Sequence, residues 1–300
     1  MKGRVREWGL AFAMLAPSVV ILVTFVIYPL IRAVWLGRQR CDALANCYRT
    51  NGWRQYIDVA QSAEFQHSLW VTVKFALLTV PVGVALGLGL AVLADRQLRG
   101  FRFFRTVFSS TVATSVAVAS LMWLFLLQPS RGVLANIDWL NSLFPVLKQP
   151  GLLNDPGTAL MSVAVSSVWA NLGFTFIVVT AGLQGIPRDL QESAYVDGAG
   201  AWRRFTNVTV PMLSPTLIFV AVVLTSRAFQ AYGEIDLLTN GGPQPYASTT
   251  TLTYLIYGSS SIAKSDAGLQ SSVAVLLFLV LLLVSGLQLR GFGRRVHYGS

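Results

Sequence analysis

The chain has 300 residues, of which 54% are hydrophobic and only 12% are charged, and its mean hydropathy is +0.58. Soluble domains usually carry about a quarter charged residues, so this composition excludes an ordinary soluble protein and indicates an integral membrane protein. The net charge of +10 is explained by lysine and arginine gathered in loops that stay in the cytoplasm. We therefore expect a lipid bilayer, and no nucleic acid, around this chain.

Six stretches are long and apolar enough to be membrane spans, because a bilayer core needs roughly twenty residues per helix. They lie at about 10–31, 70–94, 106–127, 158–183, 212–234 and 269–289. No linker or low-complexity segment interrupts them, so we treat 1–300 as a single all-α membrane domain. The first stretch exceeds a typical signal-peptide core in length, so we expect it to be retained.

The distribution of basic residues predicts the orientation of these spans. With both termini in the cytoplasm, the inner segments hold thirteen lysines and arginines and the longer outer segments hold eight. The density is higher inside, as the positive-inside rule requires, although the first outer loop is itself basic. We expect a multi-pass protein with six transmembrane helices and both termini in the cytoplasm.

The first outer loop contains the two cysteines of the chain, Cys41 and Cys47. In the oxidising environment on the outer side of the cell membrane, two thiols with this spacing can form a small disulfide. Two unpaired cysteines are equally compatible with the sequence. A metal site needs more ligands nearby than His67 supplies, so we predict none.

Packing signals and polar groups occur within the spans. Gly83, Gly87 and Gly89 predict close helix contacts in the second span, where small residues let backbones approach each other. In the fourth span, Trp169, Asn171 and Phe174 are candidates for a substrate pathway, because aromatics stack on sugar faces and an amide in a span needs a partner. Packing in the core is the simpler explanation for these three side chains.

A polar segment, 185–211, connects the fourth and fifth spans. It predicts a helix-turn-helix knob at the inner face, since Asp197-Gly198 is a turn signal and a second short helix over 201–208 carries Arg203 and Arg204. The alternative is an ordinary amphipathic connection on the lipid headgroups.

The spacing in this segment resembles the "EAA" coupling loop of the permease subunits of bacterial carbohydrate-type ABC importers, such as those for maltose and glycerol-3-phosphate. The family pattern is Glu-Ala-Ala, three residues, Gly, nine residues, then Ile-x-Leu-Pro. Glu192, Ala194, Gly198 and Pro211 fall in register with it, and Ser193 is a small replacement at the second position. The resemblance extends over the whole chain and implies the type I ABC-importer (MetI-like) permease fold.

In that family the loop docks in a cleft of a partner ATPase. The residues to which the resemblance assigns this role are Glu192, Ser193, Ala194, Asp197, Gly198, Arg203, Arg204 and Pro211. The implied partners are a second homologous permease, two ATP-binding subunits and an extracytoplasmic solute-binding protein, in the bacterial plasma membrane. No phosphate-binding loop of the Gly-x4-Gly-Lys type occurs here. We therefore expect a non-catalytic subunit without cofactors of its own, with ATP and magnesium bound by the partner ATPase.

Further matches resemble the glycerol-3-phosphate branch of the family. They are the Gly-Gly-Pro loop at Leu238–Pro243, the segment Ala247–Tyr257, the segment Arg99–Phe103 and the tail Arg294–Tyr298. They favour sn-glycerol-3-phosphate or a glycerophosphodiester such as glycerophosphocholine as the substrate. The alternative is a di- or oligosaccharide imported by the same kind of machine.

Charges inside spans are costly and are candidates for function. Arg227 lies about two-thirds along the fifth span, and at helical spacing Gln230 and Glu234 share its face. Our hypothesis is that this face lines the translocation cavity, where Arg227 attracts an anionic phosphate group. The alternative is that Arg227 pairs with Glu234, or extends to the outer surface, and never meets substrate.

Two other classes of protein compete with the importer. An ion-driven carrier working alone usually shows internal repeats and acidic residues within spans, and we find neither a clear repeat nor a mid-span acid. A membrane-embedded enzyme needs a catalytic constellation, and none is visible.

Overall fold

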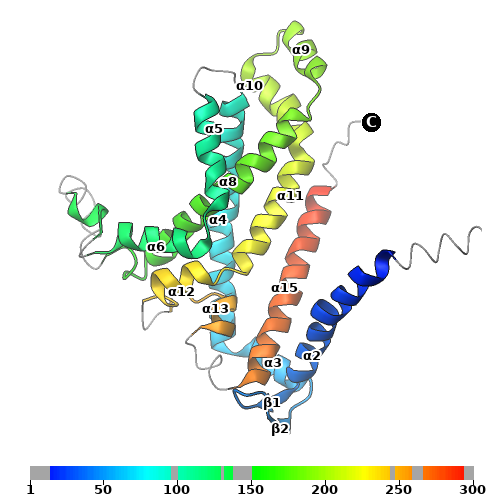
Figure 1. Cartoon of the computed structure of the whole chain (residues 1–300), viewed down its shortest axis with the longest axis vertical. Helices are drawn as coiled ribbons and strands as arrows, with labels where there is room; N and C mark the ends of the chain where they lie inside the picture. Colours follow the sequence, from blue (N-terminus) through cyan, green and yellow to red (C-terminus); the bar gives the residue numbers. More distant parts are fainter. Residues whose placement is uncertain are drawn as a thin grey trace, which may run out of the picture.

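The computed structural model describes residues 14–95, 101–129, 132–137, 151–243, 247–258 and 266–293, and these are mostly helical (Figure 1). Three expected features lie wholly or partly outside the described residues. They are the start of the first span before Met14, part of the Arg99–Phe103 segment, and the tail Arg294–Tyr298.

Five described helices are long and apolar enough to cross a membrane: Met14–Leu36, Ala63–Asp95, Ala159–Gln184, Ala201–Phe229 and Ala267–Gly291. The first contains a π-helical turn, η1 (Val23–Ile27), and then α2 (Tyr28–Leu36); the second and third are α4 (Ala63–Asp95) and α8 (Ala159–Gln184). The fourth ends in α11 (Val210–Phe229), and the fifth corresponds to α15 (Ala267–Gly293). A bent helix pair makes a sixth span if it is counted as one. The all-α membrane fold expected from the sequence is confirmed.

The third expected span, 106–127, is not one straight helix. The helix pair α5 (Phe101–Ser110) with η2 (Thr111–Ala113) and α6 (Val116–Leu127) is bent by 107°. Thr114 and Ser115 have extended backbone, with ψ of 124° and 151°, so the helical hydrogen-bond ladder stops there. The Ser115 hydroxyl accepts the Val118 N–H at 3.3 Å and starts the new helix. Apolarity alone did not reveal this break.

The four long helices α4, α8, α11 and α15 pack around two buried apolar clusters. One, nearer α9 (Arg188–Val196), joins α4, α8 and α11 through residues that include Ala91, Phe176 and Leu213. The other joins α4, α8, α11 and α15 through residues that include Phe75 and Val273. The first span has no buried residues in its most apolar window, and Figure 1 shows it leaning away from the other helices. In lipid such exposure is compatible with a stable helix, because lipid tails are as apolar as the side chains.

Glycines allow the closest of these contacts. A Cβ atom on Gly87 would overlap Cγ2 of Thr175 and lie 2.8 Å from its Cβ, so α4 and α8 can meet only because Gly87 lacks a side chain. Gly83 is also buried, and a Cβ there would lie 3.3 Å from Cδ1 of Leu224. The expected packing face is therefore used at Gly83 and Gly87. It is not used at Gly89, which faces open space.

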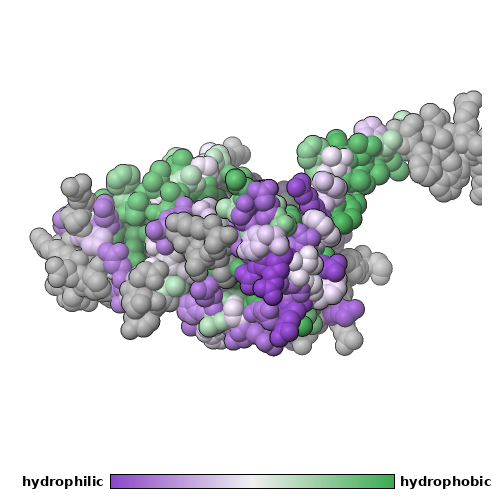
Figure 2. Space-filling view, turned by 90° about the horizontal axis from the view of Figure 1, so that it is seen from below, coloured by the Kyte–Doolittle hydropathy of each residue, from purple (hydrophilic) through white to green (hydrophobic). Residues whose placement is uncertain are grey.

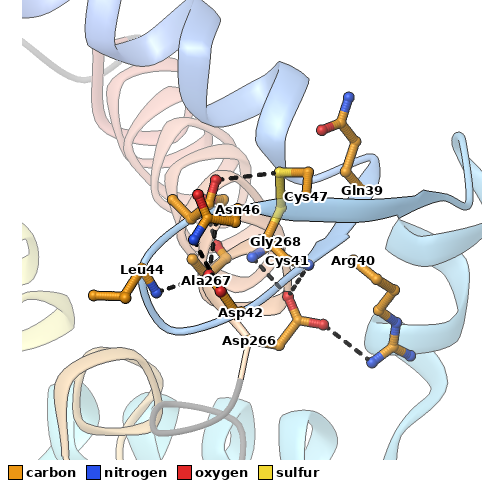
Figure 3. Close-up of a disulfide and its surroundings, with 12 residues drawn as sticks. Gln39, Arg40, Cys41, Asp42, Leu44, Asn46, Cys47, Asp266, Ala267 and Gly268 are labelled. Carbon is orange, nitrogen blue, oxygen red and sulfur yellow. Dashed lines mark hydrogen bonds and ion pairs between the residues drawn. A yellow bond between two sulfur atoms is a disulfide. The ribbon is translucent and has the colours of Figure 1, made fainter.

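A disulfide between Cys41 and Cys47 closes a small hairpin at the end of the molecule opposite α9 (Figures 1 and 3). Strand β1 (Gln39–Cys41) pairs antiparallel with β2 (Cys47–Thr50), and α3 (Arg54–Gln61) follows. The carboxylate of Asp266, just before α15, accepts the N–H groups of Cys41 at 3.0 Å and Gly268 at 2.8 Å. The hairpin is thereby fastened to the start of α15, more than 220 residues later in the sequence.

Two short helices, α12 (Gly233–Thr239) and α13 (Leu252–Tyr257), follow α11. The Gly-Gly-Pro loop begins between them with three residues at positive φ: Asn240 at 48°, Gly241 at 85° and Gly242 at 109°. The Tyr254 hydroxyl donates a hydrogen bond to Oδ1 of Asn240 at 2.9 Å, and a Cβ on Gly241 would overlap the same tyrosine ring. This turn therefore requires glycine at Gly241. A 3-10 turn, η3 (Leu134–Asn136), follows α6.

Candidate functional site

The segment between α8 and α11 forms a knob at one end of the helices (Figure 1). Helix α9 (Arg188–Val196) starts after Pro187 and carries Asp189 in its first turn, where an acidic side chain complements the helix dipole. It ends at a Schellman cap: Ala199 N–H bonds to Ala194 C=O and Gly198 N–H to Tyr195 C=O, both at 3.0 Å. Gly198 has a φ of +76°, the conformation this cap demands of its glycine.

The surface of the knob combines exposed apolar and charged groups. Val196, Trp202 and Tyr195 are 84%, 75% and 67% exposed, and the Arg204 guanidinium lies 5.2 Å above the Tyr195 ring. Glu192, Ser193, Asp197 and Arg203 are also exposed, whereas Ala194 is half-buried. Large apolar side chains grouped with charges at a protein surface mark interaction sites.

The second half of the knob differs from the expectation of a separate short helix over 201–208. Helix α10 (Ala201–Arg204) passes through a π-helical turn, η5 (Phe205–Thr209), directly into α11, so that Ala201–Phe229 is one apolar span. Pro211 lies at the start of α11 directly after this π-helical turn, so the continuous span accommodates a residue without an N–H donor at that point. A groove of about 690 Å³ separates this segment from the ends of α4 and α8, and its lining includes Asp95, Trp202 and Arg204.

A second candidate is a polar cavity of about 140 Å³ between α6, α8, α11 and α12. Its polar lining residues are Thr114, Ser120, Ser166, Ser167, Asn171, Arg227 and Glu234. A cavity with this lining among apolar helices is unusual, since polar groups within membranes are costly and mark pathways for substrates or ions.

Arg227 is held in this cavity by two contacts. Its Nη1 donates a hydrogen bond to Oδ1 of Asn171 at 2.7 Å, and its guanidinium lies 4.4 Å from the centre of the Phe174 ring. The amide of Asn171 is oriented in turn because its Nδ2 donates to the Ser167 carbonyl at 2.8 Å. The structure therefore brings Asn171, Phe174 and Arg227 together, as the substrate-pathway hypothesis requires.

The expectation that Arg227, Gln230 and Glu234 share one helical face was wrong. Helix α11 ends at Phe229 and α12 begins at Gly233, so the face does not continue, and Gln230 is exposed and outside the cavity lining. Glu234 lines the cavity from α12, and its carboxylate accepts a hydrogen bond from the Ser167 hydroxyl at 3.3 Å. Both side chains are described, and no ion pair joins Arg227 to Glu234 within 4.0 Å.

Two further observations concern residues of α6 and α8. Trp169 does not line the cavity; it packs edge-on against Trp123, with ring centroids 6.3 Å apart. Ser120 lines the cavity but was not singled out from the sequence, and its buried hydroxyl has no hydrogen-bond partner among the described residues. The only sequence signal for Ser120 is its position within an apolar run, and many serines share that property.

The profile of the family described as binding-protein-dependent transport system inner membrane component matches residues 83–298. The chain belongs to this family. It is therefore a multi-pass permease subunit of an ABC importer, which sets aside the ion-driven carrier.

Curated relatives match almost the full length. A protein of Agrobacterium fabrum is 33% identical over 295 residues, covering 97% of both chains, and one of Escherichia coli O157:H7 is 32% identical over 300 residues, covering 98% of this chain and 97% of the relative. Both are named sn-glycerol-3-phosphate transport system permease protein UgpA.

Solved structures share the fold. A chain of a bacterial ABC transporter involved in import of the acidic polysaccharide alginate superposes with a TM-score of 0.79 at 22% identity, covering 98% of both chains. A chain of the MetNI methionine ABC transporter gives 0.51 at 15% identity, covering 78% of this chain and 95% of that one. These similarities show the MetI-like permease fold expected from the sequence.

Proposed function

We propose that this subunit, paired with a second permease of the same fold, moves sn-glycerol-3-phosphate or a glycerophosphodiester across the bacterial plasma membrane. Two ATP-binding subunits supply the energy, and an extracytoplasmic solute-binding protein delivers the substrate. The chain itself contributes no catalysis and needs no cofactor; ATP and magnesium belong to the ATPase partner. A di- or oligosaccharide is the alternative cargo.

The observation that carries this proposal is the knob around α9. Its exposed Tyr195, Val196 and Trp202 would be unfavourable in water without a partner, and its charged residues would be unfavourable in lipid, so the surface suits a protein cleft. The higher density of basic residues on the same side supports a cytoplasmic position for the knob, where ATP is available. The contact with the ATPase transmits its closure to α11, which is continuous with the knob.

The cavity around Arg227 supports an anionic substrate. One guanidinium nitrogen is engaged by Asn171, and an arginine has five N–H donors, so others remain for a phosphate group. Arginine binds phosphate in a planar, charge-assisted geometry. The names of the relatives point to the same class of cargo. Alternating access would expose this cavity first to the binding protein and then to the cytoplasm.

The coupling assignment is tested by Gly198→Trp in the full complex, reconstituted in proteoliposomes. We expect uptake to be lost while the binding protein still captures substrate, because a bulky residue at φ +76° disrupts both the cap and the docking surface. Gly198→Asn is the matched control, since asparagine adopts positive φ readily and should retain coupling. Normal uptake by the Gly198→Trp complex would refute the assignment.

The substrate is tested separately by calorimetry on the solute-binding protein of the same transport system. We expect binding of sn-glycerol-3-phosphate or glycerophosphocholine and none of maltose. Binding of the sugar alone would establish the carbohydrate alternative and leave the coupling assignment intact.

A further inference from the structure

The polar cavity between α6, α8, α11 and α12 contains a second charged group besides Arg227. Glu234 is the acidic side chain among its described lining residues, and Oε1 of its carboxylate accepts the Ser167 hydroxyl at 3.3 Å. Serine is a neutral donor, and no cationic side chain lies within 4.0 Å of this carboxylate among the described residues. If Arg227 binds a phosphate group, a carboxylate in the same cavity is still without a role.

The structure holds these two opposite charges apart instead of pairing them. Arg227 donates through Nη1 to Oδ1 of Asn171 at 2.7 Å. Nδ2 of Asn171 donates to the Ser167 hydroxyl at 3.5 Å, and this hydroxyl donates to Glu234. An ion pair would satisfy both charges at once, whereas this arrangement leaves each of them with hydrogen-bonding capacity for a ligand.

Helix α8 sets the separation between the two charges. Ser167 and Asn171 are four residues apart in this helix, so they lie on one face, about 6 Å apart along its axis. Glu234 is bound at the first of these positions and Arg227 at the second. In sn-glycerol-3-phosphate, five bonds of about 1.5 Å each separate the phosphorus from the terminal hydroxyl oxygen, so the phosphate and the diol span a similar distance.

A third polar group lines the cavity from α6. Ser120 is only 1% exposed, and its hydroxyl has no hydrogen-bond partner among the described residues. An unpaired buried hydroxyl costs free energy, which a ligand rich in hydroxyl groups would recover. The volume of about 140 Å³ suits a small cargo, since pockets for drug-sized ligands measure about 300–1,000 Å³.

The carboxylate is bound nearer than the guanidinium to the end of the molecule opposite the knob. Helix α8 leads into the knob, so Ser167 comes before Asn171 on the way from the opposite end. Figure 2 views the molecule from that opposite end and shows hydrophilic residues gathered there, beside hydrophobic helix surface. A cargo bound between the two charges is therefore oriented, with the group that contacts Glu234 toward the hydrophilic end.

We propose that Glu234 is a specificity-determining residue, which accepts the two neighbouring hydroxyl groups of the glycerol while Arg227 binds the phosphate of the same molecule. This rests on the proposed function, which makes a glycerol phosphate the cargo. The two oxygens of a carboxylate accept hydrogen bonds from both hydroxyls of a diol, and the Ser120 hydroxyl adds a further partner. The ammonium group of an amine-bearing phosphodiester is the weaker candidate, because sn-glycerol-3-phosphate lacks it, whereas every cargo of this class carries the diol.

The test is initial uptake by proteoliposomes with equal amounts of assembled complex and limiting amounts of loaded binding protein. Two cargoes are compared: sn-glycerol-3-phosphate and propyl phosphate, which keeps the phosphate ester and lacks both hydroxyls. Glu234→Ala should lower uptake of sn-glycerol-3-phosphate by about ten- to hundredfold and leave that of propyl phosphate near wild type. Glu234→Gln should lie between, because its amide keeps one acceptor oxygen. Asp236→Asn is the matched control and should behave as wild type, because Asp236 is also an acid in the first turn of α12 but does not line the cavity.

Wild-type uptake of sn-glycerol-3-phosphate by the Glu234→Ala complex would overturn the proposal. Equal losses for both cargoes would also overturn it, because they would show that the carboxylate only stabilises the start of α12. A loss confined to a third cargo, glycerophosphoethanolamine, would assign Glu234 to the ammonium group instead. A wild-type complex that takes up maltose and neither glycerol phosphate would refute the proposed function itself, so the two failures are distinguishable.

Discussion

The cavity around Arg227 allows the most direct test of how this subunit handles its substrate. The guanidinium is positioned by Asn171 at 2.7 Å and by the Phe174 ring at 4.4 Å, and no described carboxylate neutralises it within 4.0 Å. A hydrogen bond to a charged group contributes about 1.5–3 kcal/mol. Removing one such contact with a phosphate group corresponds to roughly a ten- to hundredfold loss in apparent affinity.

We therefore expect Arg227→Ala to lower uptake of sn-glycerol-3-phosphate at limiting substrate by about that factor. Arg227→Lys should lie between the two, because lysine keeps the charge but not the planar fork. Asn171→Asp should resemble Arg227→Ala, since a carboxylate 2.7 Å from the guanidinium would compete with the phosphate. These variants separate the charge of the arginine from its availability.

The assay is initial uptake of radiolabelled substrate by proteoliposomes that contain equal amounts of assembled complex, with the binding protein in excess. The amount of co-purified ATPase shows that each variant is assembled. An Arg227→Ala complex that is assembled and matches wild-type uptake would refute the role of this cavity. Unchanged uptake by Asn171→Asp together with loss in Arg227→Ala would instead show that the arginine acts through packing.

Two further predictions concern stability, measured as thermal unfolding of the purified complex in detergent. Gly87→Ala should destabilise the complex by about 1–3 kcal/mol, because the new Cβ overlaps Thr175. Gly89→Ala is the control: Gly89 faces open space, so this change should be neutral or slightly stabilising. Equal effects of the two substitutions would contradict the packing argument. Asp266→Ala should cost about 3 kcal/mol or more, because the buried N–H groups of Cys41 and Gly268 lose their acceptor, and Asp266→Asn should recover part of this by retaining one oxygen. A wild-type unfolding temperature for Asp266→Ala would show that the hairpin is held by other contacts.

The knob was the part of the site that the sequence revealed best. Its signals are local: Asp197-Gly198 defines a turn, and the spacing from Glu192 to Pro211 is read along one segment. The structure places a helix, a glycine-dependent cap and exposed aromatics there. Whether these residues contact an ATPase stays a prediction.

The polar cavity was predicted less well, for a physical reason. Membrane helices are apolar on nearly all sides, so periodicity does not show which face lies inside the bundle. Asn171 and Arg227 are 56 residues apart, and only the packing of α8 against α11 brings them to hydrogen-bonding distance. Because α11 ends at Phe229, Gln230 does not line the cavity, and Glu234 lines it from a different helix, α12.

The sequence by itself determined that the chain is a helical membrane protein, where its apolar spans lie, and which family its coupling segment resembles. These properties depend on composition and on spacing along the chain. The tertiary structure decided the bend at Thr114 and Ser115, the disulfide between Cys41 and Cys47, and the hydrogen bond of Arg227 with Asn171. Each of these depends on backbone geometry or on contacts between distant residues, which hydrophobic patterns do not encode.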